Sequence, residues 1–206
     1  MSTSVSAPST TSTAASRATG RLYLVRAVIA VIWAGLFAAA LSSTGTLTAN
    51  SELPGFAGAL LILYPVIDIV ASLLDARTQQ AAGNPSAARA QLVNAAISTV
   101  AAVSLAVAAA DGPASVLRVF GAWALLSGLI QLALAITRLR RSTAGQWPMI
   151  LSGSLSAVIG LSFVLTATKT EIHLGNLNGY PVGGAIFYLF SAFRLYRTAR
   201  PEADPV

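Results

Sequence analysis

Six long apolar stretches, separated by short polar loops, constrain this chain more than any other feature. A helix needs roughly 20 predominantly apolar residues to cross a bilayer core, whereas about 10–14 fit a buried helix of a soluble protein. The stretches are of the longer kind and cover residues 22–41, 55–74, 91–110, 116–137, 147–168 and 177–193. We therefore predict an all-α membrane protein with six transmembrane helices.

The composition agrees with a chain dissolved mainly in lipid. Apolar residues make up 55% of the chain, and charged residues only 10%, against about 25% in soluble domains. The net charge of +6 comes from arginines that flank the stretches, so the expected partner is the lipid bilayer and not nucleic acid. The chain has no cysteine and one histidine, His173, which excludes disulfides and cysteine-based or histidine-rich metal sites.

The arginines also predict an orientation. One set of loops and both tails carry Arg17, Arg21, Arg26, Arg77, Arg89, Arg138, Arg140, Arg141, Arg194, Arg197 and Arg200. The loops on the other side carry only Arg118 and Lys169. Basic residues near span ends stay in the cytoplasm, so we expect both termini to be cytoplasmic.

The two ends of the chain differ from its centre. Residues 1–20 are rich in Ser, Thr and Ala and bury too little surface to offset chain entropy, so we expect a disordered tail. Residues 198–206 contain two prolines and are expected to be a loose tail. Residues 21–197 form the predicted six-helix membrane domain.

The loops on the external side are short, which forces consecutive helices to be antiparallel. They cover residues 42–54, 111–115 and 169–176, and we expect three antiparallel helical hairpins in series. The second helix of each hairpin carries an aromatic residue followed by small residues and an arginine, beginning at Tyr64, Trp123 and Tyr180. The hairpins share one orientation, as parallel repeats do.

Small residues at helical spacing predict where the helices pack, because close approach drives helix association in lipid. Such spacing occurs at Ser98, Ala102 and Ala106, at Ser152, Ser156 and Gly160, at Ala124 and Gly128, and at Gly179 and Gly183. We interpret them as packing seams.

Asp68 is the acidic residue well inside a span, where a carboxylate is costly unless it is paired or protonated. Arg26 lies at a similar depth in the first span, entered from the same side. The favoured interpretation is an Arg26–Asp68 ion pair that joins the first two helices, and the alternative is a proton-carrying role for Asp68.

Asn94, Ser127 and Gln131 are further polar residues inside spans. Ser127 and Gln131 are four residues apart and lie on one face of a helix. They are expected to form hydrogen bonds between helices, and the alternative is that they line a polar cavity.

Catalytic patterns are absent from the sequence. It contains no zinc-protease helix motif, no phosphate-binding glycine loop and no nucleophile elbow. We therefore predict that the protein is not an enzyme and has no catalytic residues, no cofactor-binding residues, no cofactor and no metal ligands.

Three segments resemble the HdeD-like family of small bacterial inner-membrane proteins, which are built from a short repeat of unknown function. They are FGAWALLSGLIQLALAITRLRR (120–141), GQWPMILSGSLSAVIGLSFVL (145–165) and GYPVGGAIFYLFSAFRLYR (179–197). The resemblance implies a multi-pass protein of the bacterial inner membrane and, through the family name, a link to acid resistance.

Two functions follow from these patterns. The first is a non-enzymatic inner-membrane protein that acts in envelope stress or acid tolerance. The alternative is a small-solute or proton-coupled transporter or channel subunit that uses Asp68, with Asn94 and Gln131 along its path. A polar cavity that reaches Asp68 with no arginine in contact would favour transport. Arg26 covering Asp68 in a bundle filled by small side chains would favour a structural role. A homo-oligomer or a membrane protein partner, contacted through the basic rim, is a further expectation.

Overall fold

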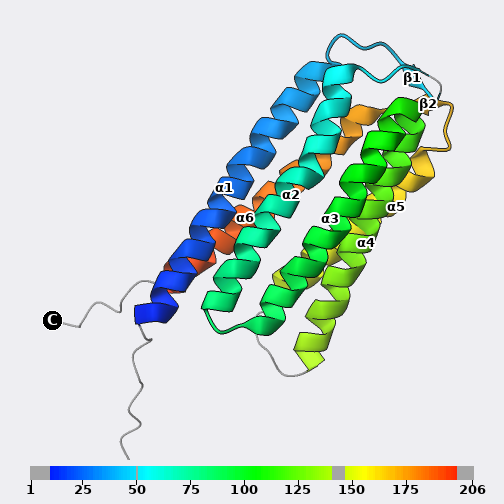
Figure 1. Cartoon of the computed structure of the whole chain (residues 1–206). Coiled ribbons are helices and arrows are strands. Elements are labelled where there is room, and N and C mark those ends of the chain that lie inside the picture. The colour runs from blue at the N-terminus through cyan, green and yellow to red at the C-terminus, as the bar shows by residue number, and fades with distance from the viewer. Residues whose placement is uncertain (1–9, 50, 141–146, 199–206) are drawn as a thin grey trace, which may run out of the picture.

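The computed structural model describes residues 10–49, 51–140 and 147–198. Over these ranges the chain forms an up-and-down bundle of six α-helices (Figure 1). The helices are α1 (Thr10–Leu41), α2 (Gly55–Ala81), α3 (Pro85–Asp111), α4 (Pro113–Arg140), α5 (Trp147–Thr166) and α6 (Gly179–Thr198). All-α architecture is thus confirmed for the described part of the chain.

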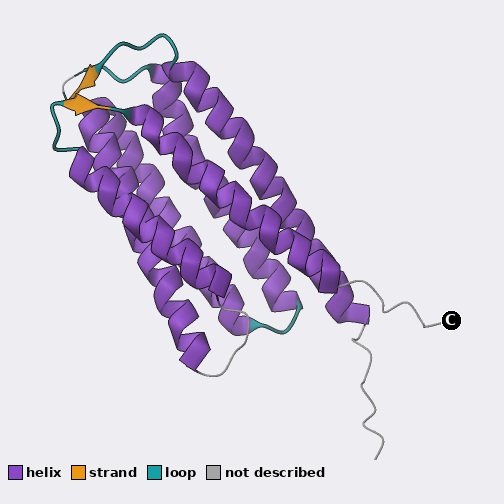
Figure 2. Ribbon diagram, turned by 180° about the vertical axis from the view of Figure 1, so that it is seen from behind, coloured by secondary structure: helices purple, strands orange, loops and turns teal. Residues whose placement is uncertain are grey.

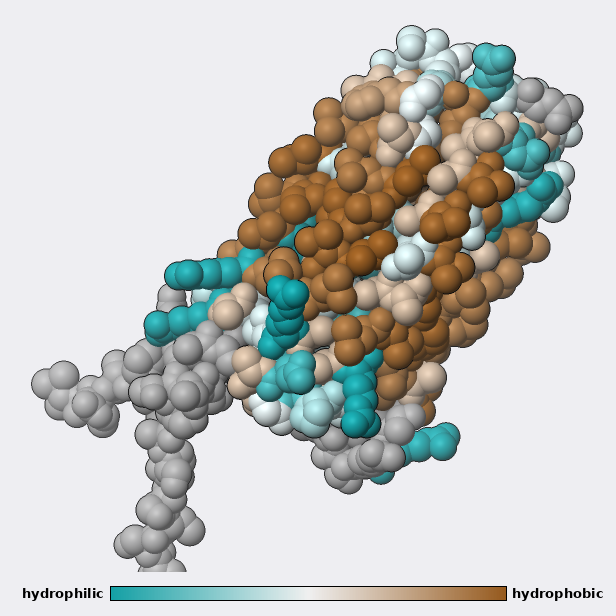
Figure 3. Space-filling model, viewed as in Figure 1, coloured by the Kyte–Doolittle hydropathy of each residue, from teal (hydrophilic) through white to brown (hydrophobic). Residues whose placement is uncertain are grey.

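The surface of the bundle suits a membrane. Five helices, α1 to α5, are long and apolar enough to cross one. Apolar residues form a broad brown belt around the visible face, and polar residues gather at its two ends (Figure 3). The protein is therefore a multi-pass membrane protein. The sixth crossing stays a prediction, because α6 contains Tyr, Gly and Arg194 among its apolar residues and is not among the five.

The prediction of a disordered tail over residues 1–20 is wrong for residues 10–20, which belong to α1. Residues 10–19 contain neither Gly nor Pro, and extending a helix that the span has nucleated costs little. Thr19 is buried, and a Cβ at Gly20 would lie 3.2 Å from Cε2 of Tyr196 in α6. Packing on α6 thus holds the start of α1. Residues 1–9 and the predicted loose tail from residue 199 onward lie outside the described residues.

The closest helix pairs are α4 with α5, α2 with α3, and α1 with α6. The predicted hairpins group the helices differently, as first with second, third with fourth and fifth with sixth, and the structure does not confirm that grouping. Short loops make consecutive helices antiparallel, but side-chain size decides how closely they approach.

Glycines explain the closest pair. A Cβ at Gly160 of α5 would lie 2.3 Å from the backbone nitrogen of Leu125 in α4. A Cβ at Gly128 of α4 would lie 2.5 Å from the backbone nitrogen of Ala157 in α5, so only glycine allows the two helices to approach this closely. The predicted seam at Gly179 and Gly183 is wrong, because a Cβ at either position would meet no atom within 4 Å.

Two loops join at one end of the bundle in a small antiparallel sheet that the sequence analysis did not predict. β1 (Leu47–Thr48) pairs with β2 (Glu171–Ile172), with Leu47 opposite Ile172 (Figure 2). A short 3-10 helix, η1 (Leu174–Asn178), leads into α6. We call this the sheet end, and we call the opposite end, where α1 begins and α6 ends, the terminal end.

Candidate functional site

A cavity of about 1400 Å³ occupies the centre of the bundle, and all six helices contribute to its wall. Its deepest lining residues, Tyr64, Trp123 and Tyr180, lie near the middle of the bundle, and its outermost ones include Ala82, just beyond α2, and Pro148, at the start of α5. The cavity therefore extends from the middle of the bundle to the terminal end.

Three aromatic side chains close the inner end of this cavity. The ring centroids of Tyr64, Trp123 and Tyr180 are 5.8, 5.9 and 6.4 Å apart pairwise. These are the residues with which the repeated aromatic pattern begins in the second helix of each predicted hairpin, and the fold brings all three together. We call them the aromatic triad, and we use it to divide the bundle into a sheet half and a terminal half.

Arg26 and Asp68 form the ion pair that the sequence predicted, with Arg26 Nη2 donating to Asp68 Oδ1. Their side chains are 11% and 17% exposed. The same Nη2 donates to the hydroxyl of Tyr188, and Arg26 Cζ lies 4.5 Å from the centroid of that ring. Arg26 thus connects α1 with α2 and α6.

The second oxygen of Asp68 is also occupied. Asn94 Nδ2 and Ser98 Oγ, both on α3, donate to Asp68 Oδ2 over 2.7 and 2.8 Å. Asn94 Nδ2 also lies 2.9 Å from Ser72 Oγ, and Trp123 Nε1 donates to Ser98 Oγ over 3.3 Å. Asp68 therefore joins α1, α2 and α3 in one hydrogen-bonded network. Asn94 makes the interhelical bond expected of it.

Ser127 and Gln131 lie in the cavity wall. The hydroxyl oxygen of Ser127 is buried and has no hydrogen-bond partner among the described residues. Ser127 therefore lies in the wall of a polar cavity, as the alternative interpretation expects, but its hydroxyl oxygen is not accessible from that cavity.

Sequence reasoning missed Asp75, which is buried in the cavity wall with 1% of its surface exposed. Gln79 Nε2 donates to Asp75 Oδ1 over 3.1 Å, and Oδ2 has no hydrogen-bond partner among the described residues. Asp75 follows Asp68 by seven residues, a spacing that places both on one helix face. That periodicity was the signal available, but Asp75 lies just past the predicted end of the span at residue 74.

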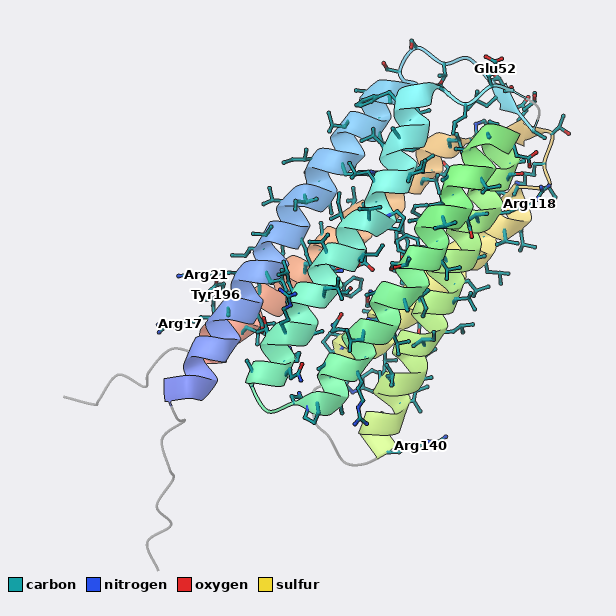
Figure 4. The ribbon with its side chains drawn as sticks, in the orientation of Figure 1. Arg17, Arg21, Glu52, Arg118, Arg140 and Tyr196 are labelled. Carbon is teal, nitrogen blue, oxygen red and sulfur yellow. The ribbon has the colours of Figure 1, made fainter. Side chains whose placement is uncertain are left out.

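The rest of the cavity wall limits the chemistry. The described residues hold no group of three His, Cys, Asp or Glu side chains that would bind a metal ion. Basic residues gather at the terminal end: Arg17, Arg21 and Arg140 lie there with Tyr196, whereas Glu52 and Arg118 lie at the sheet end (Figure 4). The arrangement suits binding of a polar molecule that enters from the terminal end.

Comparison with known proteins identifies one segment. Residues 93–165 match the family described as "Short repeat of unknown function (DUF308)". The segment covers most of α3, all of α4 and nearly all of α5, so it includes Asn94 and Gln131 but neither Arg26 nor Asp68. No curated protein and no solved structure matches the chain. The chain is thus a multi-pass membrane protein with a segment similar to the DUF308 repeat, and the narrower HdeD-like resemblance stays a prediction.

Proposed function

We propose that this protein is a non-enzymatic carrier that binds a small polar solute in the central cavity and moves it across the membrane. The observation that carries the proposal is the cavity itself, which has walls from all six helices, a mouth at the terminal end and the aromatic triad at its inner end. Cavities between helices are usual sites for small ligands.

Polar groups in the wall support binding over a purely structural role. Polar side chains inside a membrane protein are costly, and by default they mark a site or a pathway. Within the described ranges, the hydroxyl oxygen of Ser127 and Oδ2 of Asp75 are buried without a hydrogen-bond partner. A bundle selected only for stability gains nothing from these groups.

The Arg26–Asp68 pair has a different role in this proposal. The structure meets neither expected arrangement in full, because Arg26 contacts Asp68 and the bundle nevertheless encloses a polar cavity that reaches this pair. Both oxygens of Asp68 are occupied by protein donors. We therefore assign Asp68, Arg26 and Asn94 to holding the helices, and solute contact to other groups of the wall.

The helix pairing supports a mechanism of alternating access. Transporters commonly move by rocking one helix group against another around a central site. Here α1 with α6, α2 with α3, and α4 with α5 are closely packed pairs, whereas α5 and α6 are loosely packed against each other. With the arginine-rich terminal end in the cytoplasm of a bacterial inner membrane, the described conformation is the one open to the inside.

A cavity-filling variant tests the proposal. A Cβ at Gly184, in the cavity wall, meets no atom within 4 Å, so Gly184→Phe places a bulky ring in the cavity without a backbone clash. Gly35 of α1 also has no neighbour within 4 Å and lies on an exposed face, so Gly35→Phe is the matched control. Cells lacking the gene are complemented with the wild type or either variant at equal membrane abundance, and their internal and external solute pools are profiled.

We expect the wild type and Gly35→Phe to change the same solute pools, and Gly184→Phe to match cells without the gene. Equal pools with Gly184→Phe and wild type would contradict the proposal. The same strains grown at low external pH test the role in acid tolerance, and a pull-down from these membranes tests for self-association or a membrane protein partner.

A further inference from the structure

We infer that Asp75, and not Asp68, is the proton-binding carboxyl group of the cavity. The inference rests on the proposed carrier function and deepens it by naming the ion that accompanies the solute. It reverses the sequence-based alternative, which gave the proton-carrying role to Asp68. The two carboxylates belong to the same helix, line the same cavity and differ in their partners.

Both oxygens of Asp68 accept hydrogen bonds, and one of the donors is a guanidinium group. Oδ1 accepts from the guanidinium of Arg26, and Oδ2 accepts from Asn94 and Ser98. A proton on Asp68 would leave the largely buried guanidinium of Arg26 without its counter-charge, which is costly inside a protein.

Asp75 has one oxygen held and one free. Gln79, on the same helix, donates to Oδ1, and Oδ2 has no partner. Arg26 and Tyr23 of α1 and Tyr188 of α6 are charged or ionisable groups that interact electrostatically with Asp75, and Arg194 of α6 also lies in the wall of this cavity. The described structure shows no hydrogen bond from any of them to Oδ2.

The burial of Oδ2 selects a proton over a larger cation. Less than 1 Å² of this atom is accessible, so a metal ion or an ammonium group cannot touch it unless the wall moves. A proton is delivered through one water molecule, so it needs a smaller movement of the wall than a hydrated metal ion or an ammonium group of a solute. When a hydronium ion in the cavity reaches Asp75, a proton passes to Oδ2, an O–H bond forms, neutral water remains and the negative charge of Asp75 disappears. Release to a water molecule reverses this step.

This site has a direct effect on the charge of the cavity. Arg26 and Asp68 neutralise one another, so protonation of Asp75 removes an uncompensated negative charge from the α2 side of the wall. A carrier that changes this charge between its two conformations couples solute movement to the proton gradient.

Infrared spectroscopy of the full-length protein in lipid vesicles tests the site without knowledge of the solute. The C=O band of protonated carboxylic acids is followed as the pH is stepped, in the wild type and in Asp75→Asn, Asp68→Asn and Asp111→Asn. Asp111 is the matched control, because it is exposed and lies at the sheet end of α3. We expect Asp75→Asn to remove the full pH-dependent band of one carboxyl group, which the other two variants retain.

Gln79→Leu keeps the inference testable if Asp68→Asn does not fold. It removes the one hydrogen bond to Asp75 and leaves the Asp68 network in place, so it should shift the frequency of the band that Asp75→Asn removes. The inference would be overturned if Asp75→Asn lacked no band of the wild-type spectrum, or if the band that it lacked did not vary with pH.

The outcome is separable from that of the proposed function. Solute pools that respond to Gly184→Phe while Asp75 fails to titrate would leave a carrier that does not use Asp75. A titrating Asp75 with no effect of Gly184→Phe would instead contradict the carrier function.

Discussion

The sheet half and the terminal half of the bundle are built from the same six helices but are packed differently. On the sheet side of the aromatic triad, Trp33, Phe37 and Phe120 are fully buried in one apolar cluster. On the terminal side the helices enclose a cavity with polar walls and are joined by the Arg26–Asp68 network.

The difference shows how a bundle in lipid can be stable and hollow at once. Lipid is as apolar as the side chains, so helices associate through close packing and polar bonds. The sheet half uses close packing, and the two paired strands join its loops. In the terminal half, a few hydrogen bonds and the Arg26–Asp68 ion pair in the cavity wall join the helices and leave space between them. We expect the free energy of unfolding to depend mainly on the sheet half and solute binding to depend mainly on the terminal half.

The largest expected effect comes from emptying the packed half. Phe120 is 0% exposed, and Phe120→Ala should lower the free energy of unfolding by about 3–5 kcal/mol. Phe187→Ala removes the same atoms from the cavity wall and should cost less than half as much. Unfolding in mixed detergent micelles measures both, and equal losses would remove the distinction between the halves.

Breaking the ion pair should have the next largest effect. Arg26→Gln leaves Asp68 as a buried charge without its counter-ion and should cost about 3 kcal/mol. The double variant Arg26→Gln with Asp68→Asn should be more stable than Arg26→Gln alone. The same unfolding assay compares them, and a double variant less stable than the single one would show that the pair acts differently.

A smaller effect is expected at the seam between α4 and α5. Replacing Gly by Ala in an exposed helix usually stabilises it by about 1 kcal/mol, and Gly35→Ala should do so. Gly128→Ala places a Cβ 2.5 Å from the nitrogen of Ala157, so it should destabilise by about 1–3 kcal/mol. Thermal unfolding in detergent should show a higher midpoint than wild type for Gly35→Ala and a lower midpoint for Gly128→Ala. A stabilising Gly128→Ala would mean that α4 and α5 can separate freely.

The smallest effect on stability should come from the cavity wall. Gln131→Cys should change the free energy of unfolding by less than about 0.5 kcal/mol. Because the chain has no native cysteine, a membrane-impermeant thiol reagent reports this position alone. Gln131→Cys should react from the terminal side only. Leu105→Cys, at a fully buried position of the apolar cluster, should not react, and reaction of both would mean that water enters the sheet half as well.

The elements predicted best are those set by local composition. Long apolar stretches specified helices because lipid offers no partner for a free backbone group. The positions of Arg26 and Asp68 at similar depths were enough to predict their ion pair, which the structure contains. The start of α1 was missed because contact with Tyr196, far along the chain, supports it.

By itself, then, the sequence determined that the chain lies in a membrane as long helices, with arginines at one end and one internal ion pair. These follow from each segment's own preference for lipid or water. Only the tertiary structure decided which helices pack most closely, that β1 pairs with β2, and that a cavity with Asp75 in its wall lies below the aromatic triad. The reason is that these features depend on the fit of side chains from distant segments, which hydropathy and spacing along one helix do not encode.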